Sequence, residues 1–132
     1  GIPGDLLVVI EEERDAELQR DGNDLIYTLF LNMADAVLGT SVEIPGVNAK
    51  LRIKIPAGTQ SGKILRLRGK GIPDINGYGR GDLLVYVQVW TPQNLTAEEK
   101  AMFEKLKNSP NFKPAPTAED KDFYNRLKKL FQ

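Results

Sequence analysis

Hydrophobic and polar residues alternate with a period of two through the middle of the chain. The alternation is clearest over residues 51–55, and it recurs over 41–44, 64–68 and 83–90. Successive side chains of a β-strand point to opposite faces of a sheet, so each stretch is typical of a strand with one covered face. The pattern predicts a mostly β domain.

The stretches before residue 40 carry other patterns. Leu25–Leu31 is nearly all apolar, which predicts a strand covered on both faces or a buried edge strand. Residues 11–21 are polar, so we expect a linker that ends in a turn at Asp21–Asp24. Met33–Leu38 has room for about one helical turn, and Gly39 is a typical helix stop.

A helical pattern replaces the strand pattern after Trp90. Thr96–Glu99 is a capping box that opens a helix ending near Lys107, and a second box at Thr117–Asp120 opens a terminal helix. Prolines punctuate residues 108–116 and predict an extended tether between the two. The β domain is therefore expected to be followed by two short helices.

A short internal repeat suggests a longer parent protein. The sequence Gly-Asp-Leu-Leu-Val occurs at 4–8 and again at 81–85, and a Gly-Ile-Pro precedes each copy. Tandem β units would explain the repeat, whereas a chance match between two Leu/Val-rich strands is the alternative. Under the tandem interpretation, residues 1–20 are the last strand of a preceding unit plus a linker, and 21–92 form the next unit.

Composition excludes several classes of function. The chain of 132 residues has no Cys and no His, which removes thiol nucleophiles, the commonest metal ligand and the commonest general base. The run Gly58–Lys63 looks like a phosphate loop, but Ala57 and Ile64 occupy positions where that motif needs Gly and Ser or Thr. We therefore expect no enzyme activity. No apolar run approaches the roughly 20 residues of a membrane span, so a cytoplasmic location is expected.

Three runs around the central glycines carry a family resemblance: Gly58–Lys63, Leu67–Pro73 and Gly79–Leu83. Together they resemble the second C-terminal subdomain of the DnaJ family of J-domain co-chaperones. The resemblance implies a small β-sandwich-like subdomain over 21–92 and a helical dimerisation region over 93–132. It also implies binding of unfolded polypeptide, which the parent delivers to the seventy-kilodalton heat-shock chaperone through parts absent here. Zinc is implied only for the parent's cysteine-rich region, so no cofactor is expected for this chain.

Two sets of apolar residues are candidate binding surfaces. By analogy with the family's client groove, the first set would hold an extended client by strand addition, with core packing as the alternative: Tyr27, Leu29, Val42 and Ile44. The second set forms a stripe on the terminal helix and would join a homodimer, with docking onto its own domain as the alternative: Phe123, Tyr124, Leu127, Leu130 and Phe131.

Two other functions compete with client binding. The chain could be a dimerisation module with no client contact of its own. A nucleic-acid-binding domain would rest on a basic strand that carries Lys63, Arg66, Arg68 and Lys70, but 18 basic and 18 acidic residues leave a net charge of zero. Salt-dependent retention on a polyanion column would separate the nucleic-acid hypothesis from the other two.

Overall fold

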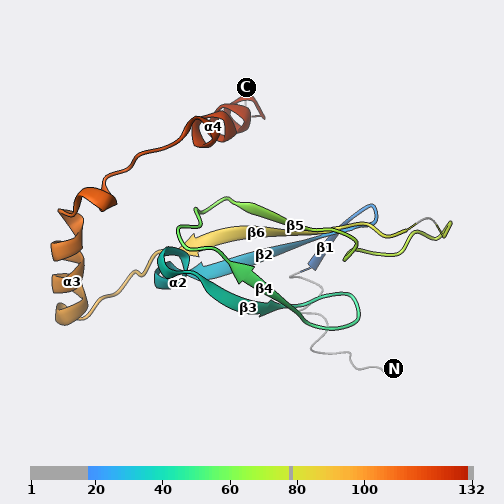
Figure 1. Ribbon diagram of the computed structural model, residues 1–132, viewed down its shortest axis with the longest axis horizontal. Coiled ribbons are helices and arrows are strands. Elements are labelled where there is room, and N and C mark those ends of the chain that lie inside the picture. The colour runs from blue at the N-terminus through green and yellow to red at the C-terminus, as the bar shows by residue number, and fades with distance from the viewer. Residues whose placement is uncertain (1–17, 78, 131–132) are drawn as a thin grey trace. The chain divides into compact units, whose positions relative to one another are not determined.

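The computed structural model describes residues 18–77 and 79–130, which fall into two compact units. The first unit ends at Pro92 and the second begins at Gln93. Figure 1 shows the strands in the first unit and the helices α3 and α4 in the second. The predicted fold class, a small β-sandwich-like domain followed by two short helices, is confirmed.

A four-stranded sheet forms one layer of the first unit. Its strands are β1 (Leu18–Asp21), β2 (Asp24–Asn32), β6 (Leu83–Trp90) and β5 (Ile64–Leu67), in that spatial order. The central pair, β2 and β6, runs parallel, and the flanking pairs are antiparallel. Parallel neighbours need a long crossover, and here the chain between them supplies the second layer.

That second layer is a two-stranded antiparallel sheet of β3 (Thr40–Ile44) and β4 (Leu51–Ile55). Helix α2 (Met33–Leu38) leads into it from β2. The Asn32 side chain caps the helix by accepting a hydrogen bond of 2.7 Å from the Ala34 N–H. Gly39 ends it at a positive φ of 86°, so the predicted helix and its stop are both confirmed.

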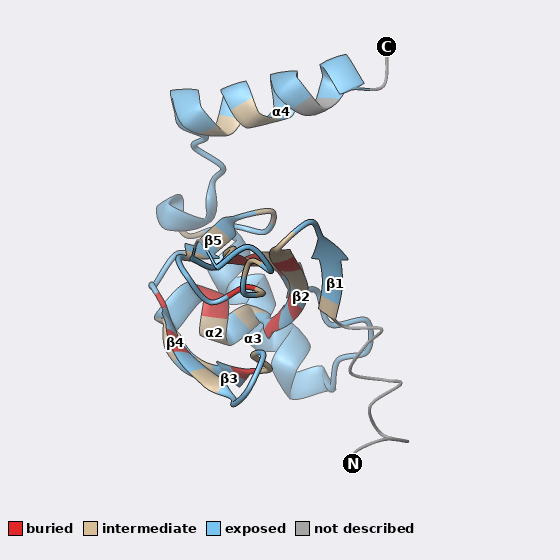
Figure 2. Cartoon of the chain, turned by 90° about the vertical axis from the view of Figure 1, so that its right-hand side faces the viewer, coloured by how far each residue is buried: buried red, intermediate tan, exposed pale blue. Residues whose placement is uncertain are grey.

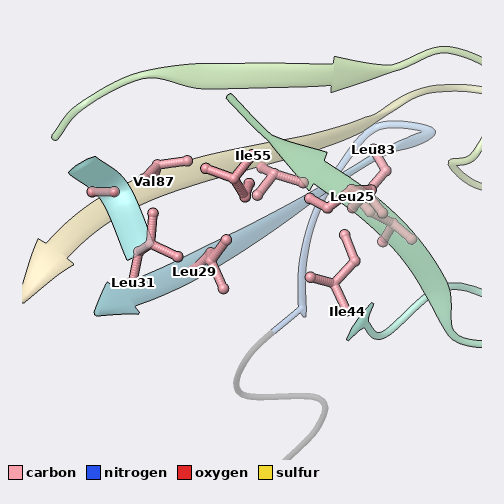
Figure 3. Close-up of a cluster of buried hydrophobic side chains, with 10 residues drawn as sticks. Leu25, Leu29, Leu31, Ile44, Ile55, Leu83 and Val87 are labelled. Carbon is pink, nitrogen blue, oxygen red and sulfur yellow. The ribbon is translucent and has the colours of Figure 1, made fainter. Parts of the chain in front are cut away.

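One hydrophobic core lies between the two sheets. Figure 3 shows side chains from β2 and β6 meeting those from β3 and β4, and Figure 2 shows buried segments on β2 and β4. Ala36 of α2 closes one end of the core. The period of two is observed on β4 and β6, because alternate residues are buried. The buried members are Leu25, Leu29, Leu31, Ala36, Ile44, Ile53, Ile55, Leu83, Val85 and Val87.

Two predictions about the N-terminal part were wrong. The expected linker over 11–21 includes strand β1 at Leu18–Asp21, which pairs with β2 through a turn at Gly22. This edge strand shows no apolar period because Leu18 is its only residue that is not fully exposed. β2 is covered on one face rather than both, since Phe30 is 67% exposed.

Residues 11–17 and the first copy of the repeat, at 4–8, lie outside the described part of the chain. The hypothesis that residues 1–20 complete a preceding β unit therefore stays a prediction.

A backbone junction ties the glycine-rich loop between β5 and β6 to the turn before β2. The Gly71 N–H donates to the Gly81 carbonyl at 2.8 Å, and the Ile72 N–H donates to the Asn23 carbonyl at 2.8 Å. A Cβ on Gly81 would collide with the Asn23 carbonyl group, and one on Gly71 would lie 2.5 Å from the same oxygen. Both positions require glycine because two backbone segments touch there.

The second unit contains α3 (Ala97–Lys107), a short 3₁₀ helix η1 (Pro110–Phe112) and α4 (Ala118–Leu130). The capping box at the start of α3 is confirmed, with the Glu99 N–H donating to Thr96 Oγ1 at 3.1 Å and the Thr96 N–H donating back to Glu99 Oε1 at 2.8 Å. The second predicted box is also present, between Thr117 and Asp120. The predicted extended tether was wrong in part, since η1 interrupts it.

We expect Gly81→Ala to destabilise the first unit by about 3 kcal/mol, because the added methyl group must displace the Asn23 backbone. Gly22→Ala is the matched control. Its Cβ would meet nothing within 4 Å, so only the positive φ is penalised, at about 1 kcal/mol. Urea denaturation of both variants measures the difference, and equal losses would contradict a packed junction.

Candidate functional site

The four predicted client-binding residues lie at one core. Leu29 is 8% exposed and Ile44 1% exposed, so both are core residues, whereas Tyr27 and Val42 are partly buried and pack against the same cluster. An incoming chain could not reach Leu29 or Ile44 without opening the two sheets. For these two residues the structure agrees with core packing, and a client contact at Tyr27 and Val42 stays a prediction.

The opposite face of the four-stranded sheet exposes aromatic side chains. Phe30 of β2 and Trp90 of β6 form an edge-to-face pair with ring centroids 6.5 Å apart, and Trp90 is 54% exposed. Ile64 of β5 is exposed on this face as well. Sequence reasoning missed the exposure of Phe30 because it placed the whole Leu25–Leu31 run inside. The sequence did contain an indication of this exposure. Phe30 is an odd number of positions from Leu25, Leu29 and Leu31, so its side chain points to the opposite face of the strand.

Among the described residues, the edge of β2 that faces away from β6 has a partner strand only as far as Tyr27. β1 pairs with β2 only up to Tyr27, and no other strand of residues 18–77 and 79–130 pairs with that edge further along. The Leu25 N–H donates to the backbone carbonyl of Asp82, the residue just before β6, at 2.8 Å. The backbone N–H and C=O groups of successive strand residues point to opposite edges of the strand. Because those of Leu25 point toward β6, those of Thr28 and Phe30 point away from it. We call this stretch, Thr28–Asn32 together with Trp90, the aromatic edge.

The phosphate-loop-like run Gly58–Lys63 is a structural turn. The Gly58 and Thr59 N–H groups donate to the Ala36 carbonyl at 2.8 and 3.2 Å. The Ser61 hydroxyl accepts a hydrogen bond of 2.9 Å from the Val89 N–H. These backbone amides join the loop to α2, so they do not form a cradle for phosphate.

Asp82 is the most strongly engaged acidic side chain at the loop junction. It accepts a hydrogen bond of 2.9 Å from the Gly69 N–H and one of 2.6 Å from Arg66, with which it forms an ion pair. The Gly69 hydrogen bond, and then that from Arg66, hold the pKa of Asp82 below its usual value. The carboxylate fixes the end of β5 to the start of β6, which is a structural role.

Neither a metal-binding cluster nor a membrane-spanning helix occurs among the described residues. No group of three or more acidic, His or Cys side chains between residues 18 and 130, position 78 apart, is arranged to hold a metal ion. Among the described helices, none combines the length and apolar character needed to cross a bilayer.

The second unit exposes apolar side chains on both helices. α3 has no buried residue, and Met102, Phe103 and Leu106 are all exposed. A depression of about 390 Å³ lies beside Phe103 and Phe112. Lys100, Glu104 and Lys107 complete its lining.

The predicted stripe on α4 is partly visible. Phe123 is half-buried and makes an edge-to-face contact with the exposed Tyr124, with centroids 5.7 Å apart. Leu130, at the end of the helix, is exposed. The side chain of Leu127 and all of Phe131 lie outside the described part of the chain. A role of the stripe in dimerisation stays a prediction.

Comparison with known proteins gives a consistent result. A family model for the DnaJ C terminal domain matches residues 1–92. The chain is 54% identical over 131 residues to the Chaperone protein DnaJ of Bacteroides fragilis, covering 99% of this chain and 33% of that protein. It is 44% identical to the protein of the same name from Salinibacter ruber, covering 99% and 34%. The chain thus spans about a third of the length of these curated relatives.

The lowered pKa of Asp82 makes a prediction about acid stability. A carboxylate with a depressed folded-state pKa stabilises the fold above the unfolded value, near 3.8, and loses that contribution as pH falls through the folded pKa. Asp82→Asn should therefore lower the melting temperature at pH 7, and the difference from the parent should vanish at strongly acidic pH. Asp74→Asn, at the loop tip, is the charge-matched control. A difference that persists unchanged at acidic pH would contradict the electrostatic origin.

Proposed function

The chain belongs to the DnaJ C-terminal domain family, and from this premise we propose that it binds non-native polypeptide and joins two copies of its parent co-chaperone. The relatives are named chaperone proteins, which supports a chaperone role. The lack of any enzyme activity is part of the proposal. Delivery of clients to the seventy-kilodalton heat-shock chaperone is proposed for the parent, through segments that this chain does not contain.

The aromatic edge is the observation that supports client binding. It offers exposed aromatic rings to the apolar side chains of an extended segment. Covering about 100 Å² on each ring would contribute about 5 kcal/mol before ordering costs. Such a contact is weak and reversible, as a holding function requires.

The residues predicted from sequence keep a supporting role in this proposal. Leu29 and Ile44 hold β2 and β3 against the core and thereby fix the position of the edge. Tyr27 and Val42 lie at the partly covered margin, where a client can touch them. The alternative, a dimerisation module with no client contact, requires the aromatic edge to be inert.

We expect the double variant Phe30→Ser with Trp90→Ser to bind a permanently unfolded test protein at least about tenfold more weakly, a loss of about 1.4 kcal/mol. Fluorescence anisotropy with a reduced, carboxymethylated protein measures it. Ile75→Ser is the matched control, because Ile75 is 95% exposed on the glycine-rich loop and lies outside the aromatic edge. Leu29→Asp and Ile44→Asp are unsuitable, since a charge in the core would unfold the unit.

Unchanged client binding by a folded double variant would remove the aromatic edge from the proposal. If the unmodified chain binds no unfolded protein at all, the alternative of a dimerisation module is favoured.

The proposed homodimer rests on the exposed helices of the second unit. α4 has 13 residues, and an isolated helix of this length is marginal in water. Docking against a second copy would cover Tyr124 and Leu130, both exposed here. Pro114 and Pro116 stiffen the segment before α4, and two-fold symmetry would form each contact twice. We therefore assign dimerisation to the stripe that the sequence predicts on the terminal helix: Phe123, Tyr124, Leu127, Leu130 and Phe131.

Truncation after Pro116 should halve the mass measured by light scattering at a concentration where the parent chain is dimeric. The truncated chain keeps α3, so a dimer that survives truncation would place the interface on α3 instead. Circular dichroism of the strands serves as the control for folding of the first unit. If the untruncated chain is monomeric at about 100 µM, the proposal of a stable homodimer is contradicted.

A further inference from the structure

Positive charge is concentrated in one part of this neutral chain. Between Lys50 and Arg80 there are eight Lys or Arg residues and a single acid, Asp74. β6, which follows, carries no charge from Leu83 to Trp90. Client binding at Phe30 and Trp90 would use apolar groups and does not account for this concentration of positive charge.

Strand β5 presents these charges at a sheet edge. It pairs with β6 on one side, and no strand within residues 18–77 and 79–130 pairs with its other side. Figure 1 shows it running beside β6. In the order β1-β2-β6-β5 it lies at the opposite end of the sheet from β1.

The backbone groups of Ile64 and Arg66 point outward along this edge. The Val87 N–H donates to the Lys63 carbonyl at 2.8 Å, so Lys63 faces β6. Because direction alternates along a strand, Leu65 faces β6 as well, and Ile64 and Arg66 face away. An added strand would find two N–H donors and two carbonyl acceptors there.

Cations surround these outward groups. Lys63, Arg66, Arg68 and Lys70 are all exposed. Arg66 forms an ion pair with Asp82, whereas no ion pair between described residues involves the other three. Positive charge therefore exceeds negative charge along the edge. Charged edge strands also discourage aggregation, and that simpler role predicts no preference for one sign of partner.

We propose that the β5 edge binds an acidic polypeptide segment in extended conformation, as an added strand. Carboxylates spaced every second residue would lie beside the exposed cations while the backbone bonds to Ile64 and Arg66. A nucleic acid would match the charge but cannot use the alternating backbone donors and acceptors. An acidic peptide and a nucleic acid can therefore be distinguished by whether the Ile64 and Arg66 N–H groups become hydrogen-bonded.

The test uses the full chain and a short synthetic peptide in which glutamate alternates with valine. The expected result is amide chemical-shift changes over residues 63–68 and slowed hydrogen exchange at the Ile64 and Arg66 amides, with little change at Leu65. A lysine–valine peptide should bind at least about tenfold more weakly. Raising the salt from low ionic strength to about 0.5 M should weaken binding, since screening shortens the range of the attraction.

Variants separate charge from backbone pairing. Lys63→Glu with Arg68→Glu should abolish the preference for the glutamate peptide. Arg52→Glu with Lys54→Glu makes the same charge change on exposed positions of β4 and should leave that preference intact. Ile64→Pro removes one outward N–H donor while β5 keeps its hydrogen bonds to β6. It should lower the affinity for the glutamate peptide several-fold. If either β5 variant is unstable, hydrogen exchange in the parent chain still decides the outcome.

Several results would overturn the proposal. Equal affinity for both peptides would indicate that the charges of β5 only discourage aggregation and do not select an acidic partner. Binding of heparin or single-stranded DNA that exceeds the peptide's, with the Ile64 and Arg66 amides still exchanging freely, would identify a polyanion surface. Protection of those amides in the chain alone, dependent on protein concentration, would show that a second copy occupies the edge. Each outcome is distinct from loss of client binding at Phe30 and Trp90.

Discussion

The parallel contact between β2 and β6 is the constraint on which the first unit depends. Its two strands lie far apart in sequence, and the hydrogen bond from the Asp82 N–H to Asp24 joins residues 58 positions apart. Forming such a contact requires closure of a long loop before any gain in packing. Gly71 and Gly81 allow the closure because their backbones touch Asn23 directly.

Once β2 and β6 are paired, their faces acquire different roles. The inner face joins β3 and β4 in a closed core. The outer face keeps Phe30 and Trp90 accessible. A sheet covered on one side only has to present its other side to water or to a partner, so the aromatic edge follows from the two-layer architecture.

The sheet also ends in two chemically different edges. On one side, Phe30 and Trp90 expose an edge-to-face aromatic pair on the outer face. On the other side, β5 is surrounded by cations. The β5 edge has outward backbone groups, and no described strand pairs with them. One small domain thus presents an exposed apolar surface and a basic one.

The sequence alone determined the strand periods, both capping boxes, the glycine stop after α2 and the family, because these depend on residues close together in the chain or on a contiguous motif. It did not determine which apolar residues are accessible. Leu29 and Phe30 are adjacent and similarly hydrophobic, yet one is core and the other is surface. Strand β1 was missed because its pairing with β2, rather than its own pattern, makes it a strand. Burial and edge exposure depend on which segments meet in space, and only the tertiary structure decided that.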